Sequence, residues 1–180
     1  MKTLTLLRHA KSGYDDPAQR DFDRALNAKG QRAAAVMGRQ AQALGLVVTH
    51  IVASPAARVV QTLEHFLTGL GSEVAPEWDR RIYLASAATL HDLVQELPDT
   101  QDSILLAGHN PGLEDLVLLL VPDASNDALR DQVELKFPTA SIAELTFGVD
   151  RWADVAANGG RLTRFVRPRD VDPSLGPDQG

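Results

Sequence analysis

The chain has 180 residues, of which 44% are hydrophobic, and it contains no cysteine. This length suits one domain with one substantial core, and the lack of cysteine excludes both a disulfide framework and a thiolate zinc site. The formal net charge is −6, with 24 acidic residues against 18 Lys plus Arg. Because binding to a phosphate backbone needs clustered basic surface, we expect no nucleic-acid partner.

Two apolar stretches of the sequence resemble an export signal or a membrane span only in part. The first residues, MKTLTLLRHAK, hold an apolar run too short for a signal-peptide core. The run LVLLLV at 116–121 is far shorter than the roughly 18 to 20 apolar residues of a membrane span. We therefore expect a cytoplasmic protein with no membrane partner.

Short apolar runs with a strand pattern alternate with segments of helical spacing. The expected strands cover 3–7, 50–54, 103–108, 140–147 and 161–166, and the expected helices cover 28–44, 55–70, 87–97 and 111–121. This alternation predicts a three-layer α/β/α fold with a mostly parallel central sheet and helices on both faces. No helical pattern separates the last two strands, so an antiparallel or edge pairing stays open there.

Capping residues set several of these boundaries. Asn27 and Gly45 suit the two ends of the first helix, Ser54 with Pro55 suits the start of the second, and Asn110-Pro111 opens another. The polar stretch 13–26 is long enough to predict a functional loop. We expect the domain to cover residues 1–166 and the tail 167–180, rich in Pro and Gly, to be mobile.

Polar side chains follow three successive predicted strands. Arg8 and His9 come after the first, Arg58 lies one turn into the helix after the second, and His109 and Asn110 follow the third. In α/β sheets ligands bind beyond the carboxyl ends of the strands, where helix N-termini favour anions. Each feature alone has a plain structural explanation, such as an ion pair, a helix start or a buried histidine. Their joint position predicts a phosphate pocket.

The residue types suit phosphoryl transfer, which needs a positioned nucleophile and charge stabilisation. Arg forks match phosphate oxygens bidentately, and a neutral imidazole can attack phosphorus to form a phosphohistidine. A second His can hold a proton for the transferring group. We therefore expect Arg8 to fix the phosphate while His9 attacks it.

Three motifs resemble those of the histidine phosphatase superfamily, which has the phosphoglycerate-mutase-like fold. They are LLRHAKS at the start, SPAAR followed by Gln61-Thr62, and GHNPG, and the nearest resemblance is to the small SixA-type phosphohistidine phosphatases. The resemblance implies that His9 is the phosphorylated residue and that Arg8, Arg58 and His109 complete the phosphate pocket. It also implies a hydrolase without a cofactor.

A further element of that subgroup, R-x-L-x-x-x-G, is matched by Arg24, Leu26 and Gly30. Arg24 is therefore a candidate phosphate ligand, with a solvated loop charge as the alternative. Lys11, Ser12 and Asn110 are expected to border the phosphate as further substrate-binding residues. One departure from the superfamily is Ala10, where Gly usually follows the nucleophile; Ala is small enough to be tolerated.

The general acid of the superfamily's ester phosphatases has no clear counterpart. Glu77 and Asp79 are present in the corresponding region, but the surrounding pattern differs. An alkoxide leaving group needs a proton in the transition state, whereas a phosphohistidine protonated on its far ring nitrogen expels neutral imidazole. This gap favours a phosphoramidate or another phosphate with a good leaving group as substrate.

We thus expect a metal-independent phosphatase acting on protein phosphohistidine. One alternative is a phosphatase or mutase for a small phosphorylated metabolite, with Glu77 or Asp79 as acid. Another is a phosphate-binding module without catalysis. No metal is expected, because His91 lacks the ligand spacing of a metal site, and His50 and His65 are expected to be structural or surface residues.

Overall fold

The structure is a computed structural model that describes residues 1–14, 16–124 and 126–177. In this part of the chain a six-stranded sheet has the order β3-β2-β4-β1-β5-β6. Its strands are β1 Lys2–Arg8, β2 His50–Ala53, β3 Glu77–Trp78, β4 Ser103–Gly108, β5 Ile142–Phe147 and β6 Gly160–Val166. The helices are α1 Ala28–Ala43, α2 Ala57–Leu70, α3 Ala87–Gln95, α4 Gly112–Leu120, α5 Ala128–Leu135 and α6 Pro168–Val171.

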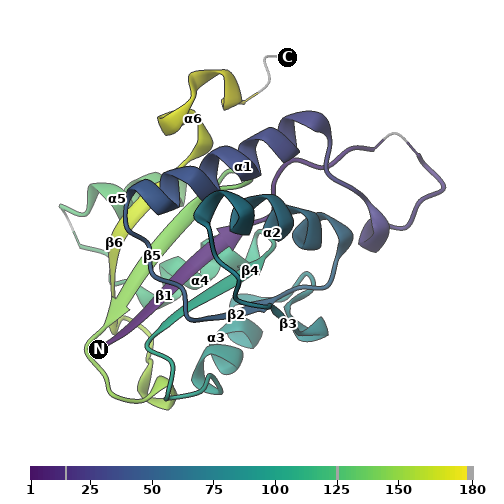
Figure 1. Ribbon diagram of the computed structural model, residues 1–180. Coiled ribbons are helices and arrows are strands. Elements are labelled where there is room, and N and C mark those ends of the chain that lie inside the picture. Colours follow the sequence, from purple (N-terminus) through teal and green to yellow (C-terminus); the bar gives the residue numbers. More distant parts are fainter. Residues whose placement is uncertain (15, 125, 178–180) are drawn as a thin grey trace.

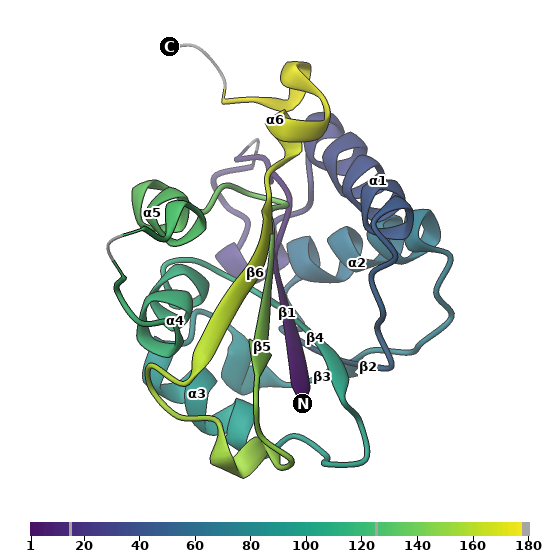
Figure 2. The same ribbon diagram turned by 90° about the vertical axis from the view of Figure 1, so that its left-hand side faces the viewer.

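The first four strands of the sheet order are parallel, and β5 runs antiparallel to both β1 and β6. Figure 1 shows β1 near the middle of the sheet, and Figure 2 shows α1 and α2 on one face with α3, α4 and α5 on the other. The predicted three-layer fold is therefore confirmed. Of the pairings considered for the last two strands, β5 and β6 form the antiparallel one.

Strand β1 shows why the sheet is buried on both faces. Leu4 and Leu6 pack into the core under α3 and α4, while Leu7 packs into the core under α1 and α2. Successive side chains of a strand point to opposite faces, so a run of Leu fits a central strand covered on both sides. The strand therefore delivers Arg8 and His9 to the carboxyl edge of the sheet.

Capping residues mark both ends of α1. The side chain of Asn27 accepts a hydrogen bond from the backbone N–H of Gly30 at 2.8 Å, and Gly45 takes a φ of +72° just after α1. The second helix differs from the prediction, because α2 begins at Ala57 and Ser54 lies before it. The hydroxyl of Ser54 instead meets His109, as described below.

Part of the C-terminal segment that the sequence predicts to be mobile is helical and contacts α1. Residues 168–171 form α6. Leu175 is 7% exposed and belongs to the apolar cluster that also includes buried side chains of α1. Lys29 of α1 donates a hydrogen bond to the carbonyl of Gly176 at 2.7 Å. One buried leucine and one side-chain hydrogen bond thus attach a segment whose composition alone suggested disorder. The last residues of the expected tail, 178–180, lie outside the described part of the chain.

Two shorter elements were not expected from the sequence. Strand β3 pairs only Glu77 and Trp78 with β2, and both side chains are exposed. Helix α5 buries Arg130 and Val133, so its inner face carries a cation where a hydrophobic residue is the usual signal. Within the described residues no helix is both long and apolar enough to cross a bilayer.

Candidate active site

All eight site residues predicted from the sequence line one cavity of about 360 Å³ at the carboxyl ends of β1 and β4. They are Arg8, His9, Lys11, Ser12, Arg24, Arg58, His109 and Asn110. The same cavity is lined by four residues that the motifs did not indicate: Tyr14, Asp21, Leu84 and Thr139. The fold thus brings together two strand ends, at Arg8 and Gly108, that lie 100 residues apart in the sequence.

His9 is 8% exposed and is held at both its backbone and its ring. Its backbone N–H donates to the carbonyl of Gly108 at 3.1 Å, and its ring Nδ1 lies 2.7 Å from the carbonyl oxygen of Ala10. A carbonyl only accepts, so Nδ1 carries the proton and Nε2 keeps its lone pair. Arg58 Nε lies 3.4 Å from this Nε2.

The pKa of His9 is lowered to about 3, first by burial and then by His109, Arg8 and Arg58, against the opposing hydrogen bond to Ala10. Burial disfavours the charged form of an imidazole, and neighbouring cations act in the same direction. His9 is therefore neutral at physiological pH, and its Nε2 carries a lone pair without any deprotonation.

Asp21 is the main residue of the pocket that the motifs did not indicate. Arg58 donates from Nη1 to the Asp21 carbonyl at 2.8 Å and from Nη2 to its carboxylate at 3.0 Å. Arg24 Nε and the Tyr83 hydroxyl donate to the same carboxylate. Together these hydrogen bonds lower the pKa of Asp21 to about 2, and the bond from Tyr83 contributes most to this shift. Asp21 is thus an anion at neutral pH and holds no proton for a leaving group.

Arg8 and Asn110 meet at a single carbonyl. Arg8 Nη1 and Asn110 Nδ2 donate to the Phe137 oxygen at 2.8 and 3.0 Å, while Asn110 Oδ1 accepts from the backbone of Glu114 at 3.2 Å. Asn110 therefore uses both ends of its amide within the protein. The buried Nε of Arg8 has no hydrogen-bond partner among the described residues, which leaves it as a donor for an anion.

Arg24 is not a solvated loop charge, because its side chain is only 11% exposed. Its Nη1 donates to Ser12 Oγ at 2.6 Å, and its guanidinium lies 4.0 Å from the centre of the Tyr14 ring. A steric contact explains why the last position of the R-x-L-x-x-x-G element, Gly30, is a glycine. A Cβ on Gly30 would lie 2.1 Å from the carbonyl oxygen of Lys11. Glycine lets α1 approach the loop that carries Lys11 and Ser12.

His109 is held by a buried hydroxyl. Its Nε2 lies 2.8 Å from Ser54 Oγ, which also accepts from the backbone N–H of Ala56 at 3.3 Å. Within the described residues His109 Nε2 is the acceptor in reach of the Ser54 hydroxyl hydrogen, so we assign the hydroxyl as the donor and place the proton of the neutral ring on Nδ1. This Nδ1 is buried without a partner among the described residues.

The pKa of His109 is lowered to about 4, chiefly by burial and next by Arg58. The two imidazole centres are 5.3 Å apart. At neutral pH both rings are uncharged. The unprotonated Nε2 of His9 lies beside the Nδ1–H donor of His109, with cationic guanidinium groups around them.

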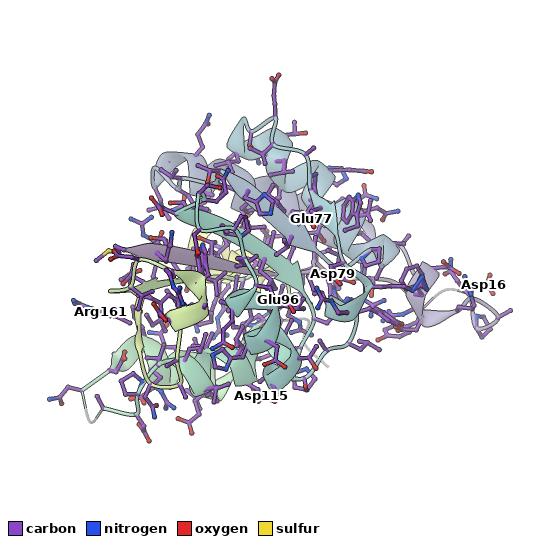
Figure 3. All side chains as sticks on the ribbon, turned by 90° about the horizontal axis from the view of Figure 1, so that it is seen from below. Asp16, Glu77, Asp79, Glu96, Asp115 and Arg161 are labelled. Atoms are coloured by element: carbon purple, nitrogen blue, oxygen red, sulfur yellow. The ribbon has the colours of Figure 1, made fainter. Side chains whose placement is uncertain are left out.

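Glu77 and Asp79, the acids considered for a metabolite phosphatase, do not line this pocket. Both line a different cavity beside β2 and α3 (Figure 3). Glu77 Oε2 lies 3.3 Å from His50 Nε2, and Asp79 forms an ion pair with Arg81 at 2.8 Å. His50 therefore has an acidic neighbour rather than a place in the phosphate pocket.

Across residues 1–14, 16–124 and 126–177, no group of three or more His, Asp or Glu side chains is arranged to hold a metal ion. The site is accordingly a basic pocket with two neutral imidazoles and one ionised carboxylate.

A family model described as the histidine phosphatase superfamily, branch 1, matches residues 4–82. The chain belongs to this superfamily, and the resemblance seen in its three motifs is confirmed. An uncharacterized protein of Mycobacterium tuberculosis is 32% identical over 91% of this chain and 100% of the relative.

Two solved structures are similar to this chain, each with 28% sequence identity. Both are provisionally assigned as the phosphohistidine phosphatase SixA. The one from Nakamurella multipartitia has a TM-score of 0.79 over 93% of this chain and 96% of that chain. The one from Agrobacterium tumefaciens has a TM-score of 0.76 over 93% and 98%.

Proposed function

We propose that the protein is a metal-independent phosphatase that works through a phosphorylated His9 and hydrolyses protein phosphohistidine. The observation that carries this proposal is the state of His9: a buried, neutral ring whose Nδ1 is fixed on the Ala10 carbonyl and whose Nε2 faces Arg58. Similarity to the two SixA structures supports the same substrate class.

In the first step His9 Nε2 attacks the phosphorus and the P–N bond of the substrate breaks. The substrate imidazole carries a proton on its other nitrogen, so it leaves as a neutral ring and takes the bonding electron pair. Arg8, Arg24 and Arg58 hold the phosphoryl oxygens, and His109 Nδ1 donates a hydrogen bond to one of them.

In the second step water attacks the phosphorus of phospho-His9. Because Nδ1 of His9 keeps its proton, His9 also leaves as a neutral imidazole, and the two water protons remain with the product as dihydrogen phosphate. Neither half-reaction needs a separate general acid. This agrees with a pocket whose carboxylate, Asp21, is ionised.

An alkyl phosphate poses a different demand. Its alkoxide leaves only with a proton, which contributes about 10² to 10⁴ in rate. Glu77 and Asp79 lie outside the pocket, so the proposal predicts a strong preference for phosphohistidine over unactivated alkyl esters.

The test measures inorganic phosphate released from a phosphohistidine-bearing protein and from an alkyl phosphate, in the presence of a chelator. We expect the wild type to prefer phosphohistidine, His9→Ala to lose turnover, and His65→Ala, a histidine outside the pocket, to keep it. Comparable turnover of both substrates would contradict the missing-acid reasoning. Stoichiometric binding without turnover would indicate a phosphate-binding module, and loss of activity in chelator would contradict metal independence.

A further inference from the structure

A second cavity, of about 480 Å³, adjoins the phosphate pocket and shares Arg8, Lys11 and Thr139 with it. Its other walls come from α1, from the segment that follows α5, and from α6 with the residues after it. Figure 2 shows α6 above the carboxyl end of β1, beside the end of α1. The C-terminal segment thus extends the pocket beyond the residues of the three family motifs.

The lining of this cavity is strongly basic. Six of the chain's 18 Lys and Arg residues line it and no acidic residue does, although the net charge of the chain is −6. These cations are Arg8, Lys11, Lys29, Lys136, Arg167 and Arg169. A concave surface lined by one sign of charge focuses its field and attracts the opposite charge.

Some of this charge is used within the protein. Arg167 forms an ion pair with Asp170 at 2.8 Å, and Lys29 donates to the Gly176 carbonyl. Lys136 and Arg169 are exposed at the rim, and no ion pair joins either of them to an acid within the described residues. Arg169 also helps to lower the pKa of Asp170, the carboxyl that Arg167 holds directly. The charge of Lys136 and the remaining field of Arg169 face a ligand or solvent.

The cavity also has apolar walls, formed by Ala33, Pro138, Pro168, Leu175 and Pro177. A compact polyphosphate would leave these walls unused. A polypeptide with acidic side chains fits both features, since its backbone and aliphatic groups cover apolar surface while its carboxylates meet the cations. If the leaving group is a histidine of a protein, the chain on either side of that histidine must lie over the neighbouring surface.

We propose that this cavity binds acidic side chains of the substrate protein close to its phosphohistidine, so that the enzyme prefers acidic flanking sequence. The inference rests on the proposed phosphohistidine phosphatase activity and specifies the substrates of that site. Lys136 and Arg169 are the specificity-determining residues at its rim.

The experiment compares two phosphohistidine peptides that differ only in Glu or Gln at the positions flanking the histidine, with phosphoramidate as a substrate that has no flanks. For the wild type we expect kcat/KM to be about three- to tenfold higher for the Glu peptide, because each partly exposed ion pair contributes a factor of a few. This preference should fall as ionic strength rises from 0.05 to 0.5 M.

The double variant Lys136→Gln with Arg169→Gln should bring the ratio of the two peptides close to one. Arg161→Gln is the matched control, because Arg161 pairs with Thr146 at the opposite end of the sheet from Arg8 (Figure 3). This control removes one positive charge, as each single variant Lys136→Gln or Arg169→Gln does, and it should keep the wild-type ratio.

Equal kcat/KM for the two peptides would overturn the inference, and so would a preference that survives in the double variant. Turnover of phosphoramidate in the same experiment would leave the proposed phosphatase activity standing. Inhibition by tripolyphosphate that is lost in the double variant, without any peptide preference, would assign the cavity to a small polyanion instead. No turnover of either peptide or of phosphoramidate would refute the proposed function and this inference with it.

Discussion

Lowering the pH from 7 to 5 should destabilise the protein through its two pocket histidines, whatever the substrate is. The pKa of His9 is lowered to about 3 and that of His109 to about 4, whereas a histidine in an unfolded chain titrates near 6.5. Between these values the unfolded state binds more protons than the folded state. Stability is therefore fully present above about pH 6.5 and is lost as the pH falls toward the folded-state pKa values.

The magnitude follows from the linkage relation. At pH 5 an unfolded histidine is almost fully protonated while the buried ring stays neutral, so each imidazole removes about 2 kcal/mol from the free energy of unfolding relative to pH 7. For the two rings this is about 4 kcal/mol, a large share of the 5–15 kcal/mol typical of a domain. The carboxylate of Asp21, with a pKa of about 2, stays ionised over this range and does not contribute.

Urea unfolding at pH 7 and pH 5 measures this difference directly. The single variants His9→Gln and His109→Gln should each reduce the difference between the two pH values by about half, because each removes one of the two titrating rings. His65→Gln, outside the pocket, should keep the wild-type difference. If both pocket variants retained the whole difference, burial of neutral imidazoles would not be its source.

Three further substitutions test individual contacts. Arg58→Lys should lower kcat/KM by about 100-fold, since Lys cannot hold Asp21 and a phosphoryl oxygen with one planar fork; a loss below threefold would contradict this. Ser54→Ala should lower kcat by about tenfold and change the pH profile, because His109 loses the hydroxyl that fixes its tautomer; an unchanged profile would leave Ser54 a packing role. Gly30→Ala should destabilise the protein by about 2 kcal/mol in urea unfolding, since its Cβ would meet a backbone oxygen that cannot move away; a gain in stability would refute the close approach.

The sequence was a good guide where a pattern is local. Strand β1 and helix α1 follow from a buried Leu run and from the cap at Asn27, both of which are encoded within a few residues. Strand β3 left no such signal, because its two exposed residues join the sheet only through backbone bonds to β2. Helix α5 was missed for a related reason, since its inner face buries Arg130, whose Nε donates to the Val121 carbonyl.

The site divides in the same way. His9, Arg58 and His109 were predicted because each belongs to a short motif at a strand end. Asp21 was not, because its bonds to Arg58 and Tyr83 cross 37 and 62 residues and exist only in the folded chain. The signals available were its place in the polar loop 13–26 and its spacing of three residues from Arg24. Both suit an ordinary surface ion pair equally well.

The place of β1 in the sheet has a consequence for how the protein is made. Both hydrogen-bonding neighbours of β1 come late in the sequence, as β4 at 103–108 and β5 at 142–147. A ribosome adding 5–20 residues per second needs about 7 to 28 s to pass from β1 to the end of β5. Until β4 is made the Leu run of β1 lacks partners on both edges, and until β5 is made it lacks one. An exposed apolar strand of this kind is prone to pair or aggregate before the fold is complete. His9 is thus synthesised well before the strands that enclose it.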